Sequence, residues 1–158
     1  MFKTFTIIGT PHYMAPEVFE GKGYSFEADY WSLGILLYEF VCGKLPFGEN
    51  VHGDPYSLYA LIKKSRLDFP KYVNDEQIKK LIQFLLVKDP KNRSQQVNFE
   101  RIKKHEYFTN FNWQDLLDDK ILPPYIPRDF RMGTEESIAS TGVPFLKEFY
   151  HNKSNCSV

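Results

Sequence analysis

This sequence contains few cysteines, no long apolar run and no excess of either charge. Its two cysteines, Cys42 and Cys156, lie far apart and match no zinc-binding spacing, so we expect a reducing compartment and neither a disulfide framework nor a metal site. Lys and Arg total 20, and Asp and Glu total 20, which excludes an overall field that would attract nucleic acid or an anionic membrane. The most apolar stretch, residues 31–43, is too short to cross a bilayer. Without a recognisable signal or transit segment, we expect a cytoplasmic protein.

Helical spacing of apolar residues recurs along the chain, whereas the alternation typical of strands does not. The sequence therefore predicts a mainly α fold, and its 158 residues suffice for one sizeable core. Residues 28–41 are apolar nearly all round, which predicts a central helix that is buried by its neighbours. Gly43 and Pro46 follow it and should end it.

Shorter helices should pack around this central helix. Residues 75–86 carry the clearest signals, because Asp75 can cap the N-terminus and Asp89-Pro90 should stop the helix. Phe108, Phe111 and Trp113 are expected to cover the helical bundle. The other short helices are predicted at 15–20, 55–65 and 98–106.

The sequence predicts three regions. Residues 1–24, rich in Gly and Pro, should form an ordered loop, and residues 25–113 the helical core. Residues 114–158 should form a largely irregular tail, because 121–130 contains three prolines and the following residues are polar. The apolar stretch 143–150 could dock in a groove or form a short amphipathic turn.

Five motifs occur in this order along the chain: GTPHYMAPE (9–17), ADYWSLGILLYE (28–39), the arginine of KDPKNR (Arg93), FNW (111–113) and PPYIP (123–127). Their order resembles the C-terminal lobe of a serine/threonine protein kinase. The resemblance covers about residues 2–127 and is to the AGC group, which contains the cyclic-nucleotide-dependent kinases; it is greatest to cGMP-dependent protein kinases. It implies a C-lobe helical bundle followed by an AGC-type tail.

The resemblance implies a buried ion pair between Glu17 and Arg93. In such kinases the glutamate ends the activation segment, and the arginine follows the penultimate helices. Removing one partner would strand a buried charge, at a cost of roughly 3–5 kcal/mol. The alternative is two exposed charges that never meet.

The resemblance also implies roles for Asp29 and Thr6. Asp29 would anchor the catalytic loop by hydrogen bonds and would be a buried acceptor without that loop; alternatively, it is a surface carboxylate that favours a helix N-terminus. Thr6 would be the activation-loop phosphorylation site, where phosphate adds charge that basic side chains clamp. The alternative is an ordinary loop threonine.

The resemblance also implies a substrate-binding set. Thr10 matches the threonine that bridges the catalytic aspartate and lysine in serine/threonine kinases. Ile7, Pro11 and Met14 match the apolar pocket for the residue after the phosphoacceptor, with simple packing as the alternative. Glu39 matches a carboxylate that receives an arginine of a basic substrate.

His12 stands where related kinases often carry a glutamate, so a weaker preference for basic substrates is expected.

The 158 residues contain no Gly-x-Gly-x-x-Gly, no Val-Ala-Ile-Lys-like strand, no His-Arg-Asp and no Asp-Phe-Gly. The catalytic residues of a kinase are therefore not among them. ATP and Mg²⁺ are expected for the full-length kinase and not for this fragment, which we expect to be inactive alone. Its partners should be protein substrates and the N-lobe of the parent kinase. A non-catalytic C-lobe module that binds protein partners is the alternative function, and an unrelated helical bundle is a third interpretation.

Overall fold

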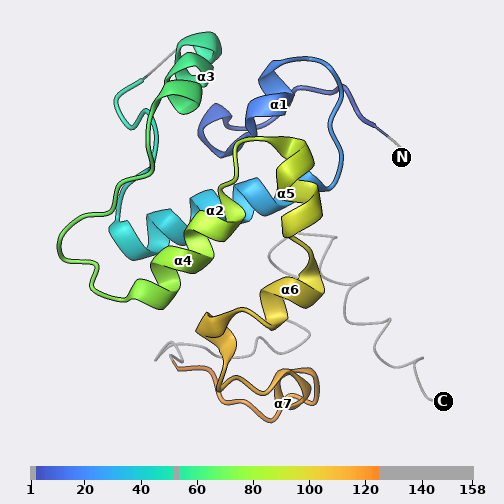
Figure 1. The fold of residues 1–158 in the computed structure, drawn as a ribbon, viewed down its shortest axis with the longest axis vertical. Helices are drawn as coiled ribbons and strands as arrows, with labels where there is room; N and C mark the ends of the chain where they lie inside the picture. The colour runs from blue at the N-terminus through green and yellow to red at the C-terminus, as the bar shows by residue number, and fades with distance from the viewer. Residues whose placement is uncertain (1–2, 52–53, 125–158) are drawn as a thin grey trace, which may run out of the picture. The chain divides into compact units, whose positions relative to one another are not determined.

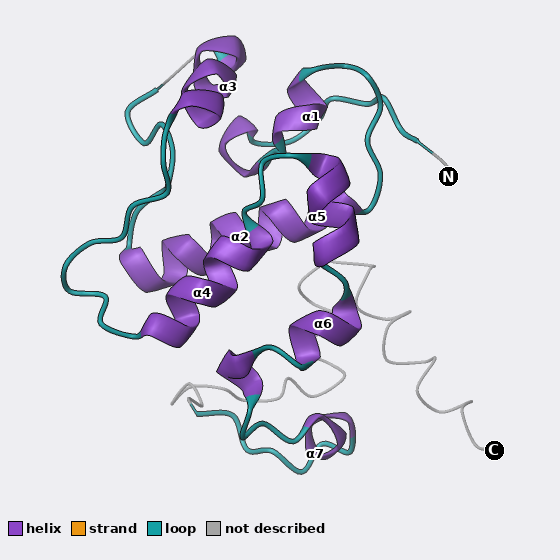
Figure 2. Cartoon of the chain, in the orientation of Figure 1, coloured by secondary structure: helices purple, strands orange, loops and turns teal. Residues whose placement is uncertain are grey.

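The computed structural model describes residues 3–51 and 54–124, and these residues form helices joined by loops (Figures 1 and 2). Within them the only strand-like pairing is an isolated antiparallel bridge between Thr4 and Tyr24. The predicted mainly α fold is confirmed. In chain order the elements are η1 (Pro11–Tyr13), α1 (Pro16–Phe19), α2 (Glu27–Cys42), α3 (Pro55–Lys64), α4 (Glu76–Leu85), α5 (Pro90–Gln96), α6 (Phe99–Lys103), η2 (Glu106–Phe108) and α7 (Trp113–Leu117).

The chain divides into two compact units, residues 1–113 and 114–158. The first unit contains the helical core. In the second unit the structure describes residues 114–124, where Lys120 forms an ion pair with Asp118 at 2.8 Å. Most of the predicted tail, including the end of PPYIP and the stretch 143–150, lies outside the described residues.

Helix α2 is the central helix of the first unit, as predicted. Trp31, Ile35, Tyr38 and Cys42 recur at steps of four and three residues, so they form one stripe along the helix, and all four are buried. Helix α4 lies beside α2 in Figure 1 and also contributes a buried stripe to the core. The matching residues of α4 are Ile78, Leu81, Ile82 and Leu85.

Gly34 allows α2 and α4 to approach closely. A Cβ atom at this position would lie 2.7 Å from Leu86 Cδ2 and 2.8 Å from Leu86 Cγ, which is closer than real Cβ atoms approach other atoms. Glycine is therefore required here by the neighbouring helix and its exit, although it weakens an isolated helix.

The opposite side of α2 is apolar but open in the described residues. Phe26, Leu33, Leu36 and Phe40 lie on this side, and Phe40 exposes 79% of its surface. We call these four residues the open α2 face. The predicted burial of α2 by its neighbours therefore holds for one side of the helix. Among the described residues no helix is both long and apolar enough to span a membrane.

The predicted cap of α4 is confirmed. One carboxylate oxygen of Asp75 accepts hydrogen bonds from the backbone N–H groups of Gln77 at 2.9 Å and Ile78 at 3.1 Å. Such bonds satisfy N–H groups that have no partner within the helix. Asp54 caps α3 in the same way, a role that the sequence analysis did not assign.

Helix α5 was not predicted. Asp89-Pro90 was interpreted only as the stop of the preceding helix, but it also begins the next one. Pro90 occupies the first turn, where a missing N–H costs nothing, and Asp89 accepts a hydrogen bond from the backbone N–H of Asn92 at 2.8 Å. This helix carries Arg93 into the core.

The predicted helix at 98–106 is shorter than expected. Helix α6 spans Phe99–Lys103, and η2 follows after a turn. Phe108, Phe111 and Trp113 lie together, with ring centroids 4.9 Å apart for Phe108 and Trp113 and for Phe111 and Trp113. Phe108 alone of the three packs against the main core. Only Phe108 therefore covers the core as predicted, whereas Phe111 and Trp113 pack on Phe108 and on each other.

Candidate substrate-binding site

The loop before α1 is held against the start of α2 by its own backbone. Thr4 and Tyr24 exchange backbone hydrogen bonds at 2.9 and 3.0 Å, and the Tyr24 hydroxyl donates to the Thr6 carbonyl at 2.6 Å. Gly9 has a φ of 115°, a conformation that favours glycine. These contacts give the segment around Thr6 a defined path.

Thr6 and Ile7 lie on the surface of this loop. Both are exposed, and Ile7 exposes 56% of its surface. Thr10 is also exposed, and its carbonyl accepts the Tyr13 N–H at 3.2 Å, which begins η1. Thr6 is therefore an exposed residue whose carbonyl is engaged by Tyr24, and its role as a phosphorylation site stays a prediction.

Pro11 is the first residue of η1 and Met14 follows its last, and both are half-buried. Met14 packs against the core, and its Cε lies 3.7 Å from the point where a Cβ atom of Gly9 would be. The structure therefore brings Met14 under the glycine turn, while Ile7 remains largely in solvent. The apolar pocket formed jointly by Ile7, Pro11 and Met14 stays a prediction.

Glu39 is fixed by a tyrosine from η1. The Tyr13 hydroxyl donates to Glu39 Oε2 at 2.7 Å, and the Ser32 hydroxyl donates to the Tyr13 carbonyl at 2.8 Å. The bond to the Glu39 carboxylate is the main reason that the pKa of Tyr13 is raised. Two helical elements thus hold this carboxylate beside the predicted substrate loop. Sequence reasoning did not identify Tyr13, although its place between Thr10 and Met14 was a usable signal.

His12 links the same loop to the segment after α2. Its Nε2 lies 3.1 Å from the Gly48 carbonyl, so the ring donates through Nε2. A glutamate at this position could not donate such a bond. His12 therefore has a structural partner in place of the substrate contact that a glutamate would make.

The structure brings Glu17 and Arg93 together. Arg93 is fully buried, and its Nη2 donates to Glu17 Oε1 in an ion pair between α1 and α5. Its Nε donates to the Glu27 carbonyl at 2.8 Å, and its Nη1 to the Val87 carbonyl at 2.5 Å. The guanidinium carbon lies 5.6 Å from the Trp31 ring centroid. One side chain therefore joins α1, the start of α2 and the exit of α4.

Three buried polar atoms near this arginine have no hydrogen-bond partner among the described residues: Glu17 Oε2, Glu27 Oε2 and Trp31 Nε1. Glu27 is 8% exposed, and its other carboxylate oxygen accepts the Ser25 N–H at 3.2 Å. Sequence reasoning missed Glu27, because nothing in the local pattern distinguishes a buried glutamate in a first helical turn from an exposed one.

The expected burial of Asp29 is wrong. Asp29 is exposed in the first turn of α2, where a carboxylate interacts favourably with the helix dipole. The burial prediction assumed a loop packed over this side chain, and within residues 3–51 and 54–124 no segment covers it. Its role as an anchor of the catalytic loop stays a prediction.

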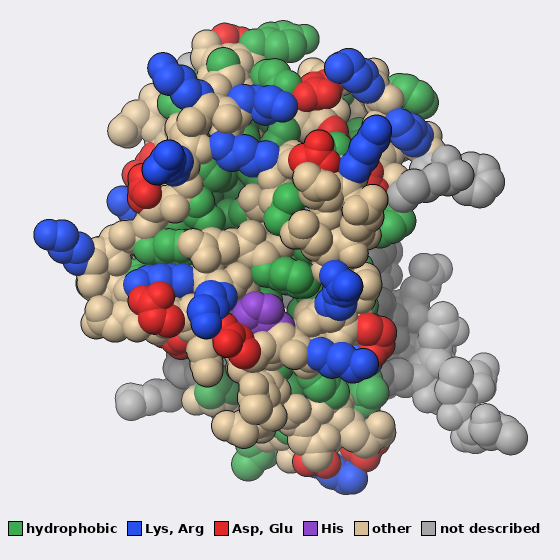
Figure 3. All heavy atoms as spheres, viewed as in Figure 1, with side chains coloured by type: hydrophobic (Ala, Val, Ile, Leu, Met, Phe, Trp, Pro, Cys, Tyr) green, Lys and Arg blue, Asp and Glu red, His purple; other side chains and the backbone are tan. Residues whose placement is uncertain are grey.

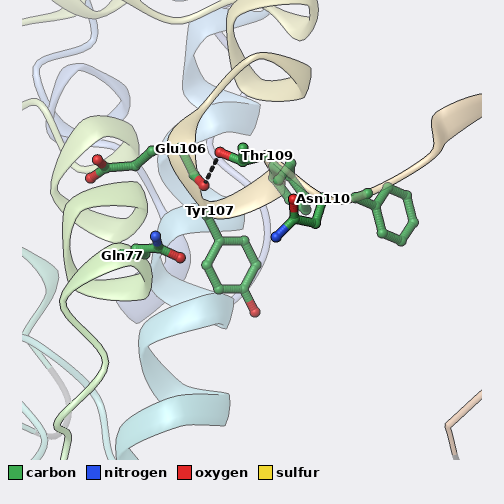
Figure 4. A pocket seen from close by; sticks show the side chains of 7 residues that line it. Gln77, Glu106, Tyr107, Thr109 and Asn110 are labelled. Carbon is green, nitrogen blue, oxygen red and sulfur yellow. Dashed lines mark hydrogen bonds between the residues drawn. The ribbon is translucent and has the colours of Figure 1, made fainter.

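A groove of about 560 Å³ lies away from all of these residues (Figure 4). Figure 4 shows Gln77 from the start of α4 opposite Tyr107, with Thr109 and Asn110 along the following turn. The Thr109 hydroxyl donates to the Glu106 carbonyl at 2.7 Å, which closes that turn. The groove shares no lining residue with the predicted substrate-binding set. It is lined by Gln77, Glu106, Tyr107, Phe108, Thr109, Asn110 and Phe111.

The residues present do not fit the Mg²⁺–ATP site of a kinase. Such a site needs oxygen ligands that converge on the metal, together with a glycine-rich loop and a lysine for the phosphates. In the described part of the chain, no three His, Cys, Asp or Glu side chains gather where they could hold a metal. The motifs that supply these groups in kinases are absent from the printed sequence.

A comparison with protein families identifies the class. The protein kinase domain family matches residues 3–108, which span the predicted substrate loop, the Glu17–Arg93 pair and the helical core. The chain therefore belongs to the protein kinase domain family.

Individual protein kinases are similar to this chain over most of its length. The chain is 41% identical over 128 residues to the cGMP-dependent protein kinase of Eimeria tenella and 40% identical over 139 residues to that of Toxoplasma gondii. It is 39% identical over 125 residues to the human RAC-beta serine/threonine-protein kinase. These alignments cover 80%, 85% and 78% of this chain but only 13%, 14% and 25% of the relatives.

Proposed function

We propose that this chain is the substrate-binding C-lobe part of a serine/threonine protein kinase of the cGMP-dependent type. The parent kinase would use ATP and Mg²⁺ to phosphorylate protein substrates. Regulation by cGMP is proposed from the similarity to the two parasite kinases. The 158 residues alone would bind substrate without phosphorylating it, because they contain none of the motifs that position ATP and metal.

The observation that carries this proposal is the position of the Glu39 carboxylate. Tyr13 holds it at 2.7 Å beside the loop that contains Thr10 and Pro11. A carboxylate fixed in advance can receive an arginine of a substrate in a paired geometry without first being ordered. The ion pair of Glu17 and Arg93 also holds this loop in place, because it attaches α1, which follows the loop, to the core.

Binding of two peptides tests the substrate site. A peptide with an arginine N-terminal to its phosphoacceptor serine, and the same peptide with that arginine replaced by alanine, would be titrated against the chain. We expect the arginine to strengthen binding in the parent chain and to lose most of that advantage in Glu39→Gln. Glu49→Gln, at an exposed carboxylate in the loop after α2, is the matched control. Equal losses in both variants would contradict the assignment of Glu39.

Phosphate transfer tests the inert character of the fragment. Incubated with ATP, Mg²⁺ and the arginine peptide, the chain should transfer no phosphate above the level of a heat-denatured sample. Transfer that follows the chain through purification would overturn this part of the proposal. The full-length kinase should transfer phosphate, and cGMP should raise its rate.

A non-catalytic module that binds protein partners is the second candidate. The open α2 face favours it, because four large apolar side chains on one side of a helix form a surface of the kind that proteins use for association. Co-purification of one partner in fixed stoichiometry, lost in Phe40→Glu, would support this function. Retention of binding in Phe40→Glu together with loss in Glu39→Gln would favour the kinase substrate site.

A further inference from the structure

Two serines in the described residues follow basic side chains directly. Ser65 lies in Lys63-Lys64-Ser65-Arg66, at the end of α3, and Ser94 follows Arg93 in α5. A kinase whose substrate cleft is acidic selects serines with such neighbours. From the sequence alone, the two serines are comparable candidates for modification by such an enzyme.

The fold makes Ser94 a poor phosphate acceptor. Its neighbour Arg93 is fully buried and bound to Glu17, so this cation cannot enter another protein's cleft. The Ser94 hydroxyl also donates to the Lys91 carbonyl at 2.9 Å. Phosphorylation here would require α5 to leave the core.

Ser65, in contrast, has basic neighbours that are exposed to solvent. Lys64 and Arg66 are exposed, and the Lys63 side chain exposes 53% of its surface. Within the described residues, the half-buried Ser65 side chain forms no hydrogen bond. Its backbone is extended, with φ −73° and ψ 149°, and residues 65–70 form no helix or strand. An extended stretch next to the acceptor is what a kinase cleft can bind after the last turn of α3 opens.

A fourth cation lies against the same segment. Lys88 Nζ donates to the Lys63 carbonyl at 3.2 Å and to the Ser65 carbonyl. Burial, and then the charge of Lys63, lower the pKa of Lys88. Lys63 is 3.7 Å from Glu20, which also lies 3.5 Å from Lys22, so one carboxylate is shared between two lysines. Figure 3 shows Lys and Arg side chains gathered around α3 on the face in view.

We propose that Ser65 is a phosphorylation site for a serine kinase with an acidic substrate cleft, and that Lys63, Lys64, Arg66 and Lys88 hold the phosphate. In the reaction the Ser65 hydroxyl oxygen forms a bond to the γ-phosphorus of ATP. The bond from that phosphorus to the bridging oxygen breaks, ADP leaves, and the hydroxyl proton passes to the base of the kinase. A second enzyme supplies the active site, so this proposal does not depend on the function proposed above. The phosphate would end α3 with a negative group, which the helix dipole opposes, but four cations outweigh that partial charge.

Site mapping tests the acceptor. The 158-residue chain would be incubated with ATP and the catalytic subunit of a cAMP-dependent protein kinase, and the phosphorylated residues would be identified by mass spectrometry. Synthetic peptides of residues 60–70 and 88–98 serve as unfolded references. We expect phosphate on both peptides but, in a preparation with a helical circular dichroism spectrum, severalfold more on Ser65 than on Ser94. Equal modification of the two serines in the chain, or none on Ser65 while its peptide reacts, would overturn the proposal.

Two variants separate recognition from binding of the phosphate. Lys64→Gln combined with Arg66→Gln alters exposed side chains only, so the chain should fold and Ser65 should react severalfold more slowly. Lys88→Met removes the half-buried amine. Phosphorylation should raise the melting temperature of the parent chain and should raise that of Lys88→Met less. An unchanged rate in the double variant would contradict the role of the exposed cations, and equal temperature shifts would contradict the role of Lys88.

Discussion

The Glu17 carboxylate binds the Arg93 guanidinium across 76 positions of sequence, and both side chains are buried. The arginine makes two further hydrogen bonds to backbone carbonyls, so each of its three nitrogens donates at least one bond. A buried pair of this kind is costly to break from one side, because the remaining charge stays in a medium that solvates it poorly. The pair thus attaches α1, which follows the predicted substrate loop, to the helical core.

Replacing Arg93 by methionine should therefore destabilise the chain by about 3–5 kcal/mol. Chemical denaturation followed by circular dichroism would measure the change. Lys80→Ala provides the control, because it breaks an exposed ion pair with Glu106, which solvent screens, so little change in stability is expected. If both variants lost the same small amount, Glu17 and Arg93 would not form a buried pair in solution.

Gly34→Ala should destabilise the chain by about 1–3 kcal/mol, because the added methyl group would collide with Leu86 and Leu85. Helix propensity alone predicts the opposite sign, a gain of about 0.5–1 kcal/mol. Ala60→Gly on the exposed surface of α3 is the matched control and should lose about the same amount that propensity predicts. A Gly34→Ala variant that is more stable than the parent would show that α2 and α4 are further apart than described.

Stability should fall as the pH is lowered from 7 toward 5 because of His105. The ring is partly buried beside Phe84, and its Nδ1 accepts the Tyr107 N–H at 3.2 Å, which requires an unprotonated nitrogen. Burial lowers the pKa of His105 below its unfolded value, so the unfolded chain binds more protons in this range and is favoured by acid. Stability is full above the unfolded pKa and decreases as pH falls toward the folded pKa.

The variant His105→Asn checks this assignment, because asparagine can accept the same bond without titrating in this range. Its unfolding free energy should vary less between pH 7 and 5 than that of the parent chain. His12→Asn is the control for a histidine whose described bond is donated through Nε2. If His105→Asn kept the full pH dependence, another group would be responsible.

The open α2 face should make the isolated chain self-associate. Phe40→Glu places a charge at the most exposed of its four residues and should lower both the binding of a hydrophobic dye and the apparent mass in solution. Leu117→Glu, at another highly exposed apolar side chain, is the control and should change either quantity less. If the two variants had equal effects, self-association would depend on exposed apolar residues in general and not on the open α2 face.

Much of the fold was accessible from local patterns. The spacing of Ile78, Leu81, Ile82 and Leu85 predicted α4, and Asp75 predicted where it begins, because helix periodicity and capping depend on neighbours within one or two turns. Helix α5 escaped the same reasoning. An Asp-Pro step can end one helix and begin another, and α5, which consists of a proline and six polar residues, carries no apolar stripe.

The candidate site was also predictable only in part. Motif order placed Glu17, Arg93 and Glu39 on the list of functional residues, but it gave no indication that Tyr13 would hold Glu39 or that Glu27 would be buried beside Arg93. Those contacts join segments that are 26 or more positions apart, and no local pattern encodes which side chains meet at that range.

By itself, the sequence determined that the chain is helical, that its core runs along 28–41, and that its motifs are those of a protein kinase, because periodicity and motif residues are properties of neighbouring positions. Only the tertiary structure decided that one side of α2 is buried and the other open, that Asp29 faces solvent, and that the basic residues next to Ser65 are free while the arginine before Ser94 is enclosed. Burial is settled by what packs against a residue, and that depends on the whole path of the chain.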